Sequence, residues 1–170
     1  MMSPEGGAPA PGHQHGEAGQ TAGESPAVGP ESHPITHLEE ILPALQAAAP
    51  VMEGSVPALY DAYFALQSAL AADDAAAAQD AAQSLRSAIE AMDEAGLTGD
   101  ARDALGRWMG AAAGAAADLR DRDLADMRRV FERVTGLVLL LERAVGPPEG
   151  ESHHLLFCPM AFDNRGATWL

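Results

Sequence analysis

Lysine is absent from this 170-residue sequence, so all ten basic residues are arginines, outnumbered by 25 aspartates and glutamates. The net charge of −15 repels nucleic acid and anionic lipid, which excludes nucleic-acid binding as a function. Cysteine occurs once, at Cys158, so an internal disulfide is excluded. The longest apolar run, residues 137–141, is far shorter than the roughly 20 residues of a membrane-spanning helix. We therefore predict no membrane span.

Motifs of catalysis are missing as well. The sequence has no Ser/His/Asp arrangement, no glycine-rich phosphate loop and no HExxH motif. No histidine lies within residues 51–148, which excludes a di-iron bundle and a histidine phosphotransfer bundle. We predict that the protein is not an enzyme and has no small-molecule substrate.

The first 34 residues consist mainly of Gly, Pro, Ala, Ser and Glu, with His13, His15 and His33 among them. Such a segment cannot bury enough apolar surface to offset the entropy of ordering it, so we predict a disordered linker. Its histidines could bind a borderline metal weakly, but an ordinary polar linker is the preferred interpretation.

Helical periodicity begins at Ile35. Residues 35–50 predict a short or kinked helix, because Pro43 interrupts the pattern. Four longer helices follow within residues 51–148. Their predicted limits are Ser55 to about Ala71, Asp73 or Asp74 to about Ala95 before Gly96, Thr98 to about Leu119, and Asp121 or Asp123 to Gly146.

Apolar residues recur every three or four positions along these helices, which is typical of the seam of a left-handed bundle. The second helix has alanine on its inner face, so it should approach its neighbours closely. Short connections make neighbouring helices antiparallel, and we predict an all-α, up-down four-helix bundle. The seam positions are Leu59, Tyr63, Leu66 and Leu70; Leu105, Trp108, Ala112, Ala115 and Leu119; and Leu124, Met127, Phe131, Val134, Val138, Leu141 and Val145.

The helical period is lost after Pro148, and residues 149–170 form a short non-helical segment. Residues 155–157 predict an extended piece, and residues 164–166 predict a turn. No partner strand is evident in the sequence. Because a lone strand is unstable in water, we expect the segment to pack on the bundle or to be incomplete.

Within this segment, Cys158 and Met160 are separated only by Pro159. In an extended segment alternate side chains share a face, so the thiol and the thioether should project together. Two sulfur ligands suit Cu(I) or Ag(I) better than Mg or Ca. A third donor would come from His153, His154 or residues beyond the sequence. The alternative interpretation is that the sulfurs pack as apolar groups and the histidines lie in a solvated loop.

Six motifs form a pattern that can be compared with known families. They are Tyr60 and Tyr63, residues 69–74, Trp108, Arg128 with Phe131, residues 158–161 (Cys-Pro-Met-Ala) and residues 166–170 (Gly-Ala-Thr-Trp-Leu). Together they resemble the domain-of-unknown-function family DUF3347, and the resemblance covers about residues 56–170. This family is found at the C-terminus of periplasmic adaptor (membrane fusion) subunits of CusB-like heavy-metal efflux transporters.

The resemblance implies an accessory domain of a periplasmic heavy-metal efflux system, with an adaptor or transporter component as partner. It also implies that the family pattern continues past Trp169-Leu170 with an Asn-Pro-Tyr stretch, a methionine and a second cysteine, so the chain looks truncated. The opening residues, MMSPEGGAPAPG, lack the regions of a secretory signal, and a periplasmic location is expected from the resemblance alone. The alternative function is a structural or protein-interaction bundle without metal chemistry.

Overall fold

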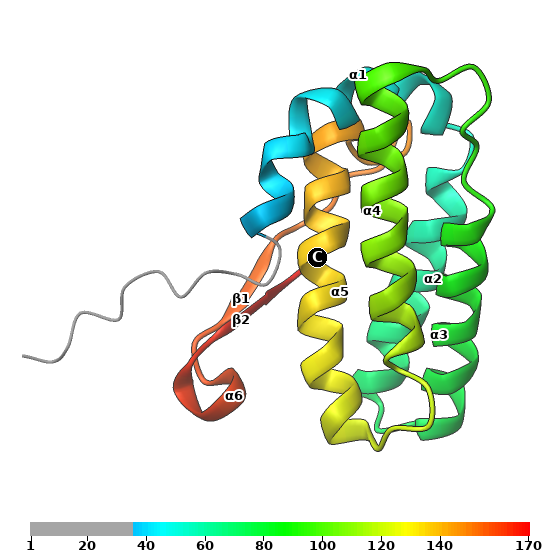
Figure 1. Ribbon diagram of the computed structural model, residues 1–170. Coiled ribbons are helices and arrows are strands. Elements are labelled where there is room, and N and C mark those ends of the chain that lie inside the picture. The colour runs from blue at the N-terminus through cyan, green and yellow to red at the C-terminus, as the bar shows by residue number, and fades with distance from the viewer. Residues whose placement is uncertain (1–35) are drawn as a thin grey trace, which may run out of the picture. The chain divides into compact units, whose positions relative to one another are not determined.

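A computed structural model describes residues 36–170, and the predicted linker at residues 1–34 lies outside the described residues. The described part is mostly helical, which confirms the all-α prediction (Figure 1). In chain order its elements are η1 (Thr36–Ile41, a 3-10 helix), α1 (Leu42–Met52), α2 (Val56–Ala71), α3 (Ala75–Glu90), α4 (Gly99–Ala117), α5 (Leu124–Val145), β1 (Leu156–Cys158), α6 (Ala161–Asn164) and β2 (Ala167–Trp169).

Side-chain caps fix where two of the helices begin. The Asp74 carboxylate accepts a hydrogen bond from the Ala77 amide at 3.0 Å, and Asp123 caps α5 in the same way. The sequence left two candidates for each cap, Asp73 or Asp74 and Asp121 or Asp123, and in both cases the second aspartate is the cap. Helix α5 ends at Gly146, whose φ of +82° favours glycine.

One predicted boundary was wrong. Helix α3 ends at Glu90 rather than near Ala95, and a non-helical connection follows it. The short or kinked element predicted around Pro43 is the 3-10 helix η1 followed directly by the short helix α1. Pro43 lies in the first turn of α1, where its missing N–H is not needed. The helix then continues through Pro50 to Met52.

The predicted seams are buried. Every seam residue of α2 and of the third predicted helix is buried, and in α5 only the two end positions, Leu124 and Val145, are half-buried. Helices α2 to α5 lie side by side, and α1 packs against α4 and α5 (Figure 1). The most extensive helix contact is between α2 and α3, where small alanines face the neighbour, as the alanine pattern predicted.

The expectation that the tail has no partner strand was wrong. Strands β1 and β2 form an antiparallel hairpin in which Phe157 lies opposite Thr168 and Cys158 lies opposite Ala167. The partner was missed because both strands are only three residues long. We call residues 156–169 the hairpin. Strand β2 packs against α5 (Figure 1).

Across residues 36–170, no helix combines the length and the apolar character that crossing a membrane requires.

Candidate functional site

The two predicted sulfur ligands lie on the hairpin, at the end of β1. Cys158 is a half-buried free thiol, and it shares the face of its cross-strand partner Ala167. Met160 is 75% exposed and has helical backbone angles, with φ −90° and ψ −6°. The extended segment therefore stops before Met160, so strand alternation does not relate the two side chains as the sequence predicted. Cys158 and Met160 are separated only by Pro159, and the Met160 side chain is accessible to solvent.

The side chain of His153, which precedes the hairpin, is buried against helices α2 and α5. Its ring packs edge-on against the rings of Tyr60 and Phe64, with centroids 4.6 and 5.1 Å away. Its Nδ1 lies 3.1 Å from a carboxylate oxygen of Glu142, and because a carboxylate only accepts, this nitrogen carries a proton. The opposite nitrogen, Nε2, is buried without a hydrogen-bond partner and lies 3.7 Å from Glu151.

A carboxylate that holds one ring nitrogen while the other stays free is the arrangement that metal-ligating histidines use. His153 has this arrangement, but its side chain is only 6% exposed, so it can reach a metal only if the segment before β1 moves. His154 is exposed two residues before β1. Among residues 36–170, no three His, Cys, Asp or Glu side chains are grouped so as to hold a metal ion.

The two tyrosines of α2 connect this helix to α5 and to the end of the hairpin. The Tyr60 hydroxyl donates to Glu142, and burial together with this carboxylate raises the pKa of Tyr60 well above its ordinary value. The Tyr63 hydroxyl forms a 3.0 Å hydrogen bond with Thr135 and accepts one from the Leu170 amide. Burial raises the pKa of Tyr63 as well, although these two hydrogen bonds oppose the shift.

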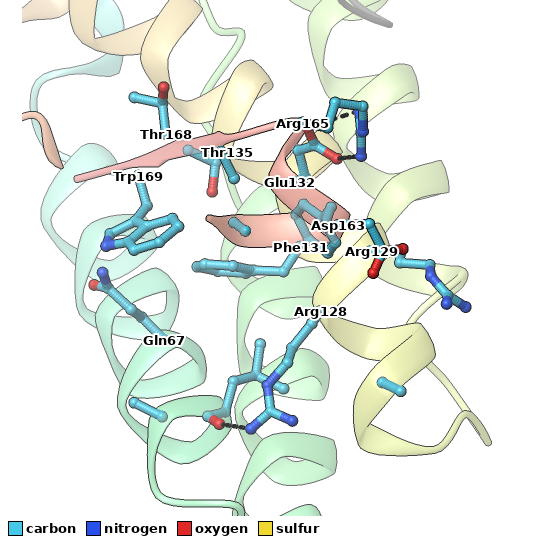
Figure 2. Close-up of a pocket in the computed structure, with 16 residues that line it drawn as sticks. Gln67, Arg128, Arg129, Phe131, Glu132, Thr135, Asp163, Arg165, Thr168 and Trp169 are labelled. Atoms are coloured by element: carbon cyan, nitrogen blue, oxygen red, sulfur yellow. Dashed lines mark hydrogen bonds and ion pairs between the residues drawn. The ribbon is translucent and has the colours of Figure 1, made fainter. Parts of the chain in front are cut away.

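The sequence analysis missed a cavity of about 780 Å³ between α2, α5 and the hairpin. Phe131 and Trp169 present aromatic rings to it, Phe162 also lines it, and Gln67 and Arg128 lie at one end (Figure 2). The residues come from segments about 100 positions apart, so no local motif could have indicated the site. The apolar residues of the short C-terminal segment, Trp169 among them, were the available signal that this segment covers a surface of the helices.

Two sets of polar contacts hold the hairpin over this cavity. The Arg165 guanidinium donates two hydrogen bonds to Glu132 of α5, at 2.8 and 3.2 Å, and lies over the Phe162 ring. At the other end, Gln67 donates to the Leu170 carbonyl at 2.7 Å. The hairpin is therefore attached to the helices by a few identifiable groups.

Comparison with protein families identifies a relationship. Residues 59–150 match the family described as "Protein of unknown function (DUF3347)", a region that runs from the first turn of α2 through α5 and ends before the hairpin. No curated protein and no solved structure matches the chain.

Proposed function

The chain belongs to the DUF3347 family of proteins of unknown function, and from that premise we propose that it is an accessory domain of a periplasmic heavy-metal efflux adaptor system. In this proposal helices α2 to α5 form an up-down antiparallel four-helix bundle, which serves as the scaffold. The hairpin presents the sulfur atoms of Cys158 and Met160 to Cu(I) or Ag(I), which is the cargo rather than a resident cofactor.

The accessibility of Met160 next to a free thiol is the observation that carries this proposal. A methionine side chain is normally buried as a gap-filling apolar group, and leaving it 75% exposed costs apolar burial. Binding of one soft metal ion by the Met160 thioether and the Cys158 thiol would account for this exposure. Two sulfurs leave Cu(I) short of a third donor, and in this proposal a histidine of residues 153–154 supplies it after a movement of the segment before β1.

Competition against a chromogenic Cu(I) chelator under reducing conditions tests the proposal. We expect wild type to retain copper, Cys158→Ser to lose it, and Met160→Leu to retain it more weakly. The double variant His13→Ala/His15→Ala is the control and should behave as wild type. Equal retention by wild type and Cys158→Ser would rule out the sulfur site.

The second candidate function is protein docking without metal chemistry. Three large apolar side chains at the start of the hairpin favour it. Leu155, Leu156 and Phe157 are each more than half exposed, close in sequence to Cys158. Pull-down of an efflux adaptor component distinguishes the two. Docking alone predicts loss of capture in Leu156→Ser with Phe157→Ser and unchanged capture in Cys158→Ser.

A further inference from the structure

The cavity under the hairpin is separate from the proposed sulfur site, since neither Cys158 nor Met160 lines it. Its volume of about 780 Å³ is in the range of sites that enclose small molecules, roughly 300–1,000 Å³. Its walls come from two helices and the hairpin, so it exists only when the hairpin is in place.

Aromatic rings form the main apolar surface of this cavity. Phe131 is fixed from behind by Tyr63, whose ring stacks on it at 5.1 Å with the planes 19° apart. Trp169 is half-buried and presents its indole to the same cavity (Figure 2). Two flat aromatic side chains in the lining favour a flat aromatic ligand over a flexible alkyl chain.

The cavity is lined by three of the ten arginines, Arg128, Arg129 and Arg165. Two carboxylates, those of Glu132 and Asp163, line it as well. Arg165 is held by both oxygens of Glu132, and Arg129 pairs with Asp126 and points away from the aromatic rings (Figure 2). These two are therefore poor candidates for binding a ligand.

Arg128 is the arginine best placed to bind an anion. Its Nη2 donates to the Leu70 carbonyl and to Asp73, which fixes the guanidinium at the end of the cavity below Phe131 (Figure 2). Both recorded bonds use the same nitrogen, so among the described residues Nε and Nη1 remain available as donors. A guanidinium fixed in this way binds a carboxylate with little further loss of entropy.

We infer that the cavity binds a flat aromatic acid, with its ring against Phe131 and Trp169 and its carboxylate on Arg128. The sequence analysis predicted no small-molecule substrate, and this site would add a ligand that is bound and not transformed. Naphthalene-2-carboxylate is a suitable probe, because its rigid two-ring body carries a single carboxylate.

Isothermal titration calorimetry of the full chain with this probe tests the inference. We expect saturable binding with one site, and at least about tenfold weaker binding of the neutral naphthalene-2-carboxamide, since a charge-assisted hydrogen bond is lost. Decanoate, which has the charge without the flat rings, should also bind at least about tenfold more weakly. Equal binding of acid and amide, tighter binding of decanoate, or no saturable binding of the acid would overturn the inference.

Variants locate the site. Arg128→Gln should weaken binding of the acid about tenfold and leave the amide unchanged, whereas Arg129→Gln, its neighbour on α5, should bind within about twofold of wild type. Ala125→Phe places a ring in the cavity from an exposed helical position, so it should abolish binding without disturbing the core. This variant decides the matter if Arg128→Gln fails to fold. Wild-type affinity in Ala125→Phe would contradict the assignment.

Discussion

In helices α2 to α5 the large apolar side chains of the seams are buried, whereas the hairpin and its flanks leave Leu155, Leu156, Phe157 and Met160 more than half exposed. Each of these helices packs against the next one in the chain, α2 on α3, α3 on α4 and α4 on α5. The hairpin is attached through β2, the Arg165–Glu132 pair, and the contacts of Leu170 with Tyr63 and Gln67. The difference separates a region whose large apolar side chains are buried from one whose large apolar side chains remain accessible to solvent.

The largest effect should come from the centre of the helical region. Phe131 is 8% exposed and stacks on Tyr63, so Phe131→Ala should lower the free energy of unfolding by about 3–5 kcal/mol. Arg129, two residues earlier, is exposed, and Arg129→Ala should change the free energy of unfolding by no more than about 0.5 kcal/mol. Urea unfolding followed by circular dichroism measures both. Equal effects would mean that the seam is not where the stability resides.

Alkaline pH should weaken the contact between the two regions through the tyrosines. The folded state raises the pKa of Tyr60 and Tyr63 above the unfolded value of about 10, so the unfolded chain releases these protons first. This stabilisation is complete below about pH 10 and is lost as the pH rises above that value. Because the chain has no lysine, no lysine titration overlaps with that of the tyrosines in this pH range.

Absorbance at 295 nm measures the ionisation directly. We expect neither tyrosine to titrate near pH 10 in the folded protein, and a fall in melting temperature above that pH. The urea-unfolded chain is the control and should titrate near its ordinary value. Normal titration of both tyrosines in the folded protein would contradict the buried contacts with Glu142 and Thr135.

A smaller and more local effect is expected at Gly166 of the hairpin. Its φ is +83°, and an added Cβ would lie 2.7 Å from the Phe157 ring, so Gly166→Ala should strain the hairpin by about 1–2 kcal/mol or more. Hydrogen exchange of the β2 amides should accelerate by about tenfold while the helices keep their protection. Gly110→Ala is the matched control, since a Cβ there meets nothing within 4 Å. Equal loss of protection in α5 would show that the two regions are not separable.

The helical region was well predicted, because apolar residues that recur every three or four positions over a long segment indicate which face of a helix is buried. The seam of α5, from Met127 to Leu141, could be identified from spacing, and residue type narrowed the cap to Asp121 or Asp123, of which Asp123 is the cap. The short or kinked element predicted at Pro43 corresponds to the change from the 3-10 helix η1 to helix α1. The family match covers this helical region.

The hairpin could not be predicted in the same way. Its strands are only three residues long. The loop that connects them has left-handed backbone at Phe162 and Asp163, and a phenylalanine gives no indication of that conformation because it rarely adopts it. Burial of His153 depends on Tyr60 and Glu142, which are distant in sequence. Cys158 and Met160 were identified as a pair by their spacing, but their relative direction depends on where β1 ends.

The most direct test of the proposed soft-metal site is nuclear magnetic resonance of the protein with carbon-13 in its methionine methyl groups, titrated with Ag(I). The chain has seven methionines, and Met160 is the one that the account assigns as a ligand. We expect the Met160 methyl signal to shift on addition of one equivalent of Ag(I), and to stay in place in Cys158→Ser. A Met160 signal that does not move in the wild-type protein would contradict the proposed site.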